Sequence, residues 1–433
     1  MQVEQKTLNR AVLSSLIGAT IEWYDFFLFG VVAGVVLNKL YFPSHDPAVS
    51  LMLAYATFAV GFVTRPLGGI VFGHFGDRIG RKSVLVATLI IMGVATFLVG
   101  LVPTYAQIGL WAPALLLTIR VFQGIGLGGE WGGSVLMAYE FAPEHKRGFY
   151  TSIPQMGLSI GILLASGSLA LLSSTLSNAD FMAWGWRICF LASFVLVLVG
   201  LWIRLRLVET PDFAGVKAHH QEVKLPIASV LKNDTRNVLL GLGARHIDGV
   251  FFNIFAVFAV SYLIGTVNVP RNSVLVALMV GAAALTVFIP LAGWLSDRVV
   301  RSRLFATAAL ISALSVFPAF YLMRNSGGSM AIIWLAIIIP YGFLYSAVYG
   351  NVAALQCDLF EPNVRYTGIS FVYQTTSVIA GLTALICTVL VKLDHGEPWL
   401  VCWYVLLSGL LSYGCARLIG RTRAGRALPV PAR

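Results

Sequence analysis

Long runs of apolar residues, separated by short polar segments, make up most of this chain of 433 residues. An apolar run of about 20 residues can cross a hydrocarbon layer of about 30 Å as one α-helix. Twelve such runs occur, at roughly residues 14–38, 50–74, 83–102, 112–140, 149–175, 186–207, 236–264, 272–295, 304–323, 329–357, 364–392 and 398–418. The pattern predicts an all-α membrane protein with twelve transmembrane helices.

A longer polar segment, residues 208–235, divides these runs into two sets of six. It separates a predicted N-terminal bundle, residues 1–207, from a predicted C-terminal bundle, residues 236–418, and residues 419–433 form a short basic tail. We expect the segment and the tail to lie outside the membrane, because both are polar.

The two sets of runs share sequence landmarks. GHFGDRIGRK at Gly73–Lys82 recurs in weaker form as GWLSDRVVRSR at Gly293–Arg303, so that Asp77 and Asp297 are 220 residues apart. Parallel repeats of this kind form two halves with a substrate site at their interface, near the middle of the membrane. The sequence therefore predicts two pseudo-symmetric six-helix bundles around a central site.

Charged residues are scarce, and the basic ones are unevenly placed. The chain is 58% hydrophobic and 11% charged, with a net charge of +11. Most Lys and Arg residues fall at one set of alternate run ends, and the opposite ends carry few: Lys39, Arg187, Arg271, Arg324 and Lys392. Short loops rich in Lys and Arg stay on the cytoplasmic side, so we expect both termini there. The basic excess then reflects topology and contact with the lipid bilayer, and it does not indicate nucleic-acid binding.

Residues that could act in catalysis do not occur in the sequence arrangements that enzymes need. The sequence contains no HExxH motif, no Ser-His arrangement and no nucleotide-binding loop, so an enzyme or an ATP-driven pump is disfavoured. No cofactor or metal is expected. The cysteines fit small core residues better than disulfides or metal ligands, because they occur in or beside apolar runs without CxxC spacing: Cys189, Cys357, Cys387, Cys402 and Cys415.

Two acidic residues, Glu22 and Asp25, lie near the middle of the first apolar run. They are three residues apart and share one helix face. A charge at this depth costs about 2.5–3.5 kcal/mol or more, so it marks a partner or a wet cavity. Two adjacent carboxylates in a dry setting do not both stay ionised, so we predict that Asp25 and Glu22 carry protons. A static ion pair with Arg65 or Arg120 is the alternative.

Arg65 and Arg120 place a guanidinium in two other apolar runs. A guanidinium binds a carboxylate bidentately and keeps its charge, so one of the two could bind an anionic substrate while the other pairs with an acidic residue. We expect Arg120 to bind the substrate and Arg65 to have the structural role.

Two further carboxylates, Glu130 and Asp248, also lie within apolar runs. Glu130 is seven residues after Gln123 on a common face, and we predict it to be a second protonatable site or a gate partner. Asp248 is predicted to couple to protons and to form a local ion pair with Arg245, although Arg245 could instead extend to the lipid headgroups, which we favour.

Glycines repeat at four-residue spacing in the fourth run, at Gly124, Gly128 and Gly132. This spacing predicts close helix packing and not a phosphate-binding loop. The remaining candidates for the transport pathway are polar residues within runs, which suit a hydroxylated organic acid better than an apolar drug: Tyr24, Gln123, Gln155, Asn253, Tyr349 and Gln374.

At the level of motifs, GHFGDRIGRK resembles the signature of the major facilitator superfamily. EWYDF, VGFVTRPLGG, RVFQGIGLGGEWGG, APEHKRGFYTSIPQMG, WGWRICFLAS and VETPDF together resemble the metabolite–proton symporter family, and most of all its shikimate–proton symporter members. The resemblance extends across the whole chain. It implies the major facilitator fold, a monomer in the bacterial inner membrane, protons as the coupling ion and alternating access.

The resemblance also implies a conformational gate at the cytoplasmic loops. Asp77 would meet the N-terminus of a helix from the other half, with basic residues holding acidic partners. The gate residues are predicted to be Asp77, Arg78, Gly80, Arg81, Lys82, Arg147, Asp297, Arg298 and Arg365. The second copy has Val300, Arg301 and Ser302 where the first has Gly-Arg-Lys, so we expect a weaker contact there.

These expectations converge on a secondary active transporter, not an enzyme, that takes up a small organic anion such as shikimate together with protons. Import of a zwitterionic osmolyte such as proline or betaine is an alternative, but the tail RTRAGRALPVPAR is too short for the coiled coil of osmosensing relatives. A drug exporter, a membrane enzyme and a channel are less favoured alternatives.

Overall fold

The computed structural model describes residues 5–220 and 223–421, and within these ranges twelve helices are long and apolar enough to cross a membrane. The predicted number is confirmed. The spans cover Gln5–Leu40, Val49–Ile79, Arg81–Leu101, Trp111–Phe141, Glu144–Thr175, Asn178–Leu205, Thr235–Gly265, Ser273–Ser296, Arg301–Arg324, Met330–Cys357, Arg365–Leu393 and Trp399–Ile419. The polar tail lies mostly in residues 422–433, outside the described residues.

Each half contributes six spans, and several spans are built from more than one helical segment. The N-terminal half contains α1 (Gln5–Val32), α2 (Asn38–Leu40), α3 (Pro47–Val63), α4 (Arg65–Ile79), α5 (Arg81–Leu101), α6 (Tyr105–Ile108), α7 (Trp111–Phe141), α8 (Arg147–Thr175), α9 (Asn178–Asp180) and α10 (Trp186–Leu205). The C-terminal half contains α13 (Thr235–Asn253), α14 (Ala259–Gly265), α15 (Arg271–Ser296), α16 (Arg301–Arg324), α17 (Met330–Ile337), α18 (Tyr345–Cys357), α19 (Arg365–Leu393) and α20 (Trp399–Ile419).

The spans are interrupted where the backbone departs from a regular α-helix. α3 ends at Val63 and α4 begins at Arg65, where Pro66 lacks the N–H that a continuous helix would need. π-helical turns join α13 to α14 at Ile254–Phe258 and α17 to α18 at Ile338–Leu344, the latter containing Pro340. Such turns are frequent at functional sites, because they redirect the side chains that follow.

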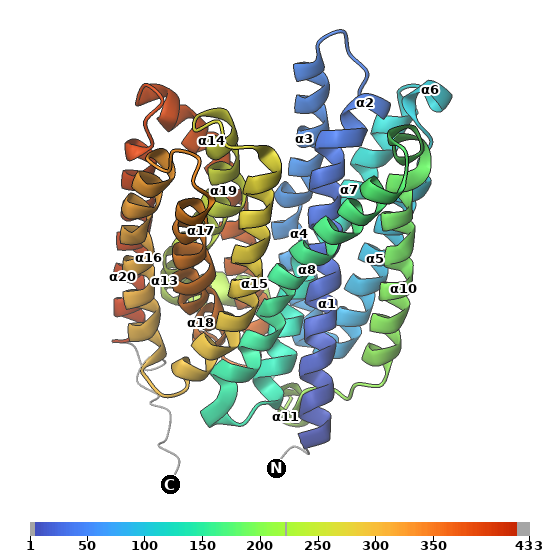
Figure 1. The fold of residues 1–433 in the computed structure, drawn as a ribbon. Coiled ribbons are helices and arrows are strands. Elements are labelled where there is room, and N and C mark those ends of the chain that lie inside the picture. Colours follow the sequence, from blue (N-terminus) through green and yellow to red (C-terminus); the bar gives the residue numbers. More distant parts are fainter. Residues whose placement is uncertain (1–4, 221–222, 422–433) are drawn as a thin grey trace.

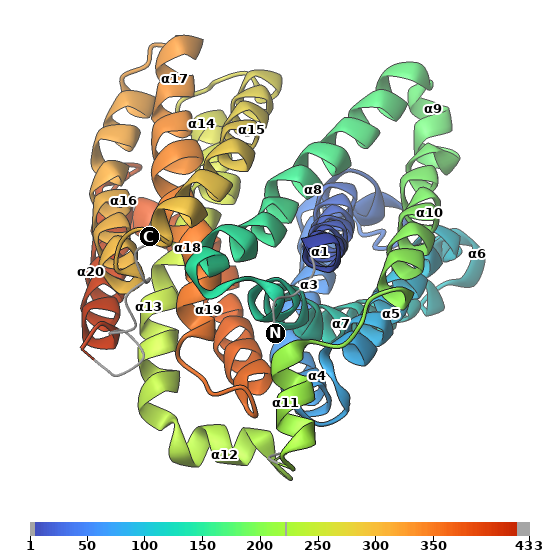
Figure 2. The ribbon, with the colours of Figure 1, turned by 90° about the horizontal axis from the view of Figure 1, so that it is seen from below.

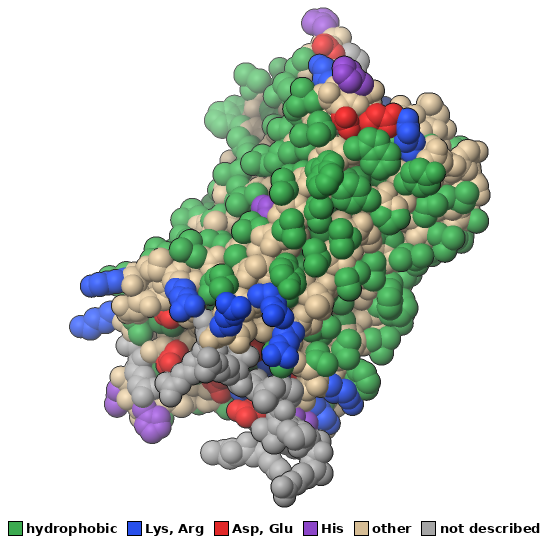
Figure 3. All heavy atoms as spheres, turned by 90° about the vertical axis from the view of Figure 1, so that its left-hand side faces the viewer, with side chains coloured by type: hydrophobic (Ala, Val, Ile, Leu, Met, Phe, Trp, Pro, Cys, Tyr) green, Lys and Arg blue, Asp and Glu red, His purple; other side chains and the backbone are tan. Residues whose placement is uncertain are grey.

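The two halves stand side by side, with the N-terminal half in blue and green and the C-terminal half in yellow to red (Figure 1). The helices of the central segment, α11 (Pro211–Ala218) and α12 (Pro226–Asn233), run along one end of the molecule from one half toward the other (Figure 2). We call this end the basic end, because the exposed Arg78, Lys146 and Arg298 lie at the helix ends and turns there. Apolar side chains cover the middle of the face in Figure 3, and most Lys and Arg gather toward this end.

The halves come together most closely where α8 meets α15. A Cβ atom added at Gly148 would lie 2.7 Å from the carbonyl oxygen of Gly293, and one added at Gly293 would lie 2.6 Å from the carbonyl oxygen of Gly148. Both positions therefore need glycine in this state. Within the N-terminal half, Gly124 and Gly128 approach the backbone of Gly61 and Arg65 in the same way, which confirms the packing prediction for the fourth span.

Candidate functional site

A small cavity of about 40 Å³ lies between the two halves. The spans that form it are the first, second and fifth of the N-terminal half and the first, fourth and fifth of the C-terminal half. Its lining residues are Trp23, Phe26, Phe62, Arg65, Leu158, Arg245, Asp248, Gly249, Phe252, Asn253, Tyr345, Tyr349, Tyr373, Ser377 and Ala380. This is the interface at which the internal repeat predicts a substrate site.

Arg65 is the cation that the N-terminal half presents to this cavity. Its side chain is buried, yet its Nε and Nη2 have no hydrogen-bond partner within the part of the chain that the structure describes. The guanidinium lies 4.7 Å from the ring centroid of Phe26 and 4.9 Å from that of Phe62. Aromatic faces attract a cation but leave its N–H groups unsatisfied. Arg65 therefore has unused hydrogen-bonding capacity at the edge of a cavity.

Arg245 and Asp248 form the charged group of the C-terminal half. Arg245 Nη2 lies 3.2 Å from Asp248 Oδ2, and Arg245 Nη1 donates to the carbonyl oxygen of Tyr373 at 2.9 Å. Tyr345 donates its hydroxyl to Asp248 Oδ1 at 2.7 Å. The preference for Arg245 at the lipid headgroups is wrong, because the side chain turns inward to pair with Asp248 and is only 3% exposed.

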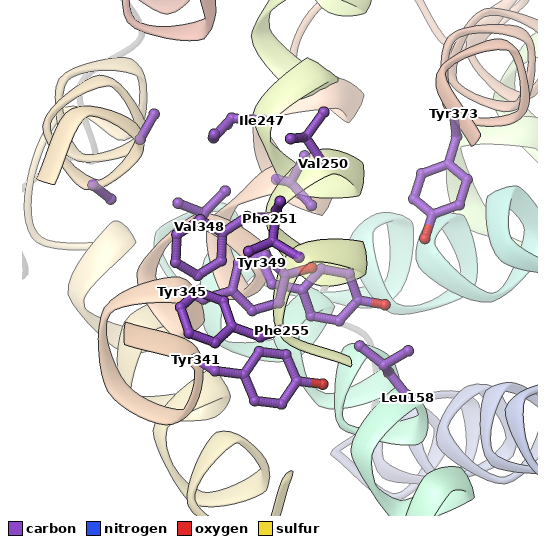
Figure 4. Packing of buried hydrophobic residues seen from close by; sticks show 14 of the residues in the cluster. Leu158, Ile247, Val250, Phe251, Phe255, Tyr341, Tyr345, Val348, Tyr349 and Tyr373 are labelled. Atoms are coloured by element: carbon purple, nitrogen blue, oxygen red, sulfur yellow. The ribbon is translucent and has the colours of Figure 1, made fainter. Parts of the chain in front are cut away.

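A stack of tyrosines lies beside the cavity, and two of its members, Tyr345 and Tyr349, line it. Tyr341, Tyr345 and Tyr349 are spaced four residues apart, and their rings stack at centroid distances of 5.8 and 5.6 Å. Figure 4 shows these rings along one side of the apolar cluster, with Tyr373 reaching it from a separate helix.

Between the cavity and the basic end, polar side chains join the two halves directly. Trp131 stacks on Tyr373 at 3.6 Å and donates its Nε1–H to Gln155 at 2.9 Å. Gln155 donates to the carbonyl oxygen of Tyr349, and Gln374 donates to that of Gly128 at 3.1 Å. Of the predicted substrate residues, Gln155 and Gln374 thus join the two halves outside the cavity lining, while Tyr349 and Asn253 line the cavity.

A second polar cluster lies inside the N-terminal half. Asp25 accepts a hydrogen bond from Thr96 at 2.8 Å, and Gln123 donates to the same Thr96 and accepts from Arg120, both at 2.8 Å. Among the described residues, Asp25 Oδ1 has no hydrogen-bond partner.

Arg65 lines the cavity between the halves, whereas Arg120, the arginine that we expected to bind the substrate, is not among the lining residues. Arg120 packs 4.1 Å from the ring of Phe29 inside its own bundle. Gln123 and Tyr24, also predicted to bind substrate, belong to this interior as well, since the Tyr24 hydroxyl donates to the carbonyl oxygen of Cys189 at 3.0 Å. In the described chain these three residues lie away from the cavity lining.

Glu130 has a partner that the sequence analysis did not identify. It forms a buried ion pair with Arg204 of α10 and accepts hydrogen bonds from Thr88 at 3.0 Å and Ser134 at 2.9 Å. Both of its oxygens therefore have partners inside the N-terminal half. Neither Arg65 nor Arg120 pairs with it.

Asp77 anchors the first contact across the basic end. Its carboxylate accepts hydrogen bonds from the backbone N–H groups of Tyr366 at 3.2 Å and Thr367 at 2.9 Å, in the first turn of α19. Arg81 lies 3.4 Å from Asp77 and 3.4 Å from Glu140. An anionic side chain at a helix N-terminus satisfies free N–H groups and interacts favourably with the helix dipole.

Asp297 makes the corresponding contact in the opposite direction. It accepts from the backbone N–H groups of Gly148 at 2.7 Å and Phe149 at 2.8 Å, in the first turn of α8. Arg301 lies 3.0 Å from Asp297, at the same i,i+4 spacing as Arg81 from Asp77. The expectation of a weaker second contact is wrong, because the donors are backbone N–H groups and do not depend on the missing Gly-Arg-Lys ending.

The other predicted gate residues divide into two groups. Arg365 joins the halves and the central segment, since it pairs with Glu140 at 3.2 Å and with Asp212 at 2.7 Å. Lys82 and Gly80 contact the segment that precedes α11, where Leu205 and Glu209 lie.

Arg147, Arg78 and Arg298 make more local contacts. Arg147 lies over the ring of Tyr139, which donates to Asp358 of the other half at 2.6 Å. Arg78 and Arg298 are exposed, and each contacts a residue one turn earlier in its own helix.

Sequence reasoning missed the acidic partners of the gate, Glu140, Asp358 and Asp212, and the buried Arg204. A signal for two of them was present. Glu140 and Asp358 precede Arg147 and Arg365 by the same seven residues, so the repeat itself links them. Arg204 offered no such signal.

Comparisons with known proteins agree with this architecture. The family model described as "Sugar (and other) transporter" matches residues 11–238 and 227–414. The chain is 38% identical over 406 residues to the inner membrane metabolite transport protein YhjE of Escherichia coli K12, covering 93% of this chain and 92% of that protein. It is 37% identical over 425 residues to the shikimate transporter of the same strain, covering 95% and 94%.

More distant relatives align with most of this chain. The proline/betaine transporter of Salmonella typhimurium LT2 is 31% identical over 405 residues, covering 90% of this chain and 79% of that one. A solved structure of the proton:xylose symporter XylE with a bound bromodeoxyglucose aligns with a TM-score of 0.77 at 16% identity, covering 96% of each chain, which concerns the fold alone.

Proposed function

This chain belongs to the sugar (and other) transporter family of the major facilitator superfamily, and on that premise we propose that it imports a small organic anion together with protons. As a family member it is a membrane transporter and not an enzyme. The anion, the proton coupling and the direction of transport are the parts that we propose.

The observation that carries the proposal is the guanidinium of Arg65 at the cavity between the halves, whose Nε and Nη2 have no hydrogen-bond partner among the described residues. A buried cation without hydrogen bonds is costly unless a ligand satisfies it. A carboxylate fits this fork bidentately, and the aromatic rings of Trp23, Phe26 and Phe62 beside it offer apolar surface to the body of a ligand. These features support an organic carboxylate such as shikimate.

Coupling to protons follows from the acidic residues beside this site. Glu22 of α1 is buried and interacts electrostatically with Arg65. An anion that neutralises Arg65 weakens the stabilisation of ionised Glu22, so anion binding and protonation of Glu22 favour each other, and this linkage is reciprocal. Asp25, one turn further along the same face, has an unpartnered oxygen and is the second proposed proton site.

The contacts of Asp77 and Asp297 hold the basic end closed. By the distribution of Lys and Arg we assign this end to the cytoplasm, with both termini inside. The state described is then closed toward the cytoplasm, and transport requires these contacts to separate after the cavity is loaded.

Uptake into proteoliposomes with an imposed pH gradient tests the proposal. Labelled shikimate, quinate, benzoate, succinate and proline should be compared, and we expect accumulation of at least one carboxylate that a protonophore abolishes. Arg65→Gln should remove this uptake, while Arg78→Gln, an exposed arginine at the basic end, should leave it intact. Retained uptake in Arg65→Gln would show that the anion site is wrongly placed.

The proton sites need a separate measurement. Asp25→Asn and Glu22→Gln should still exchange labelled substrate across the membrane, because exchange does not require net proton movement. We expect both variants to lose accumulation driven by the pH gradient. If Asp25→Asn still accumulates substrate, its assignment to proton coupling is wrong.

A zwitterion is the second candidate, because the cavity also contains the oppositely charged pair Arg245 and Asp248. Proline in the same uptake panel distinguishes the two: uptake of proline in preference to every carboxylate would favour the zwitterion.

A further inference from the structure

Two guanidinium groups line the cavity, and they differ in how their charge is compensated. Arg65, from the N-terminal half, has no ion pair or hydrogen bond among the described residues. Arg245, from the C-terminal half, is held by Asp248 at 3.2 Å, by the carbonyl oxygen of Tyr373 at 2.9 Å and by the hydroxyl of Thr376. Only one of these two cations is therefore ready to receive a carboxylate.

Two features hold Asp248 in its ion pair with Arg245. The two residues are three positions apart on α13, so the backbone of one helix sets their separation. Tyr345 of α18 fixes the other carboxylate oxygen with a hydrogen bond of 2.7 Å. Both oxygens of Asp248 are thus occupied, and the guanidinium of Arg245 rests 3.4 Å from the ring centroid of Tyr373.

When Asp248 is ionised and Glu22, which interacts with Arg65 from outside the lining, is protonated, the cavity has one positive charge without a negative partner. The lining contributes Arg65, Arg245 and Asp248 as its charged side chains, and the tyrosines Tyr345, Tyr349 and Tyr373 as its other ionisable groups. A ligand with one carboxylate neutralises this site through Arg65. A second carboxylate on the ligand could reach a cation only by displacing Asp248 from Arg245, which would leave a buried carboxylate unpaired.

We propose that Asp248 is a built-in carboxylate ligand of Arg245 that restricts the cavity to anions with a single carboxylate group. The inference rests on the proposed function and names its substrate class: a monocarboxylate whose carboxylate binds Arg65 and whose body lies between Trp23, Phe252 and Tyr373. Dicarboxylates and tricarboxylates are excluded because the second guanidinium is already occupied.

Removing the charge of Asp248 should allow anions with two carboxylate groups to bind in the cavity. In Asp248→Asn the side chain keeps its shape and can still accept a hydrogen bond from Tyr345, but Arg245 loses its ionic partner and becomes a second cation without a compensating charge. We expect the affinity for a dicarboxylate to rise by roughly 100-fold relative to that for a monocarboxylate, since a buried charge pair would form in place of an unpaired charge.

The double variant Arg245→Gln/Asp248→Asn provides the matched comparison. It removes the pair together and leaves Arg65 as the single cation, so we expect the selectivity of the unmodified protein to return. Because this variant leaves no unpaired charge in the cavity besides Arg65, which is unpaired in the unmodified protein too, it also serves if Asp248→Asn alone fails to fold. Loss of monocarboxylate binding in the double variant would mean that Arg245 binds the substrate directly, which overturns the proposal.

Ligand-dependent thermal stabilisation of the purified full chain in nanodiscs measures these affinities. Shikimate, quinate and benzoate serve as monocarboxylate probes, and succinate, isophthalate and citrate as probes with two or three carboxylates. We expect at least one monocarboxylate, and no probe of the second group, to stabilise the unmodified protein, and isophthalate or succinate to stabilise Asp248→Asn. An unchanged preference in Asp248→Asn, or a dicarboxylate preference in the unmodified protein, would refute the inference.

The same panel of ligands distinguishes a failure of the inference about Asp248 from a failure of the proposed function. If monocarboxylates bind and Arg65→Gln abolishes their binding, while Asp248→Asn changes no preference, then the anion site stands and only the role of Asp248 is wrong. If none of the probes binds and Arg65→Gln has no effect, the proposed function fails and the inference fails with it.

Discussion

Replacing Asp77 with asparagine should open the basic end of the molecule. In the closed state the buried carboxylate accepts two backbone hydrogen bonds from the first turn of α19, at 3.2 and 2.9 Å. Asparagine has nearly the same shape but only one acceptor oxygen, and its NH₂ group would face the second backbone N–H. The closed state loses one hydrogen bond and its charge at the helix N-terminus, while the separated state, in which Asp77 is free of α19, is little affected.

The size of the effect follows from these two losses. A hydrogen bond to a charged group contributes about 1.5–3 kcal/mol, and a charge at a helix N-terminus contributes about 0.3–1 kcal/mol, or up to about 2 kcal/mol when partly buried. Asparagine retains part of the interaction, so we expect the closed state to lose about 2–4 kcal/mol. This corresponds to about a 30- to 700-fold change in the ratio of closed to open molecules.

Distances between two spin labels report this ratio. Labels at Ser83→Cys and Glu361→Cys would lie on opposite halves at the basic end, at two exposed positions, in a background without the five native cysteines. We expect a single short distance for the parent and an added longer distance for Asp77→Asn. Arg78→Gln is the matched control, because the neighbouring arginine is exposed and contacts His74 of its own helix.

An unchanged distance distribution in Asp77→Asn, in a preparation where another gate variant shows the longer distance, would refute the reasoning. It would mean that the remaining contacts of Arg81, Arg365 and Asp297 hold the basic end closed without the charge of Asp77.

Two further predictions concern packing and a buried charge. Gly148→Ala should also open the basic end, because a Cβ there would lie 2.7 Å from a backbone oxygen of the other half. Gly167→Ala on the same helix is the control, since a Cβ there meets open space and the variant should behave as the parent. The same spin-label distances measure both variants. Glu130→Gln should lower the free energy of unfolding by about 3–5 kcal/mol, because it leaves the charge of Arg204 buried and unpaired. Thermal unfolding measures this loss, and a midpoint equal to that of the parent would mean that the ion pair is not structural.

Much of the architecture was predictable from the sequence because lipid imposes a simple rule. Backbone polar groups must be satisfied within each span, so every long apolar run becomes a helix, and the count of twelve follows directly. The repeat identified Asp77 and Asp297 as equivalent, and the structure gives them equivalent partners at the first turns of α19 and α8.

The roles of the buried arginines were not predictable in this way. Arg65 and Arg120 both lie in apolar runs, and apolar residues surround each helix, so no hydrophobic stripe shows which face points toward the cavity. The structure turns Arg65 toward the interface and Arg120 into its own bundle, the reverse of the expectation.

The sequence by itself determined the membrane class, the twelve spans and the two related halves. It also identified the charged residues whose burial within the membrane is energetically unfavourable. Tertiary structure decided which charges far apart in the chain are partners: Glu130 pairs with Arg204, 74 residues later, and Arg65 faces the cavity. The physical reason is that burial makes each charge require a partner, but the packing and rotation of helices far apart in the chain decide which partner it meets.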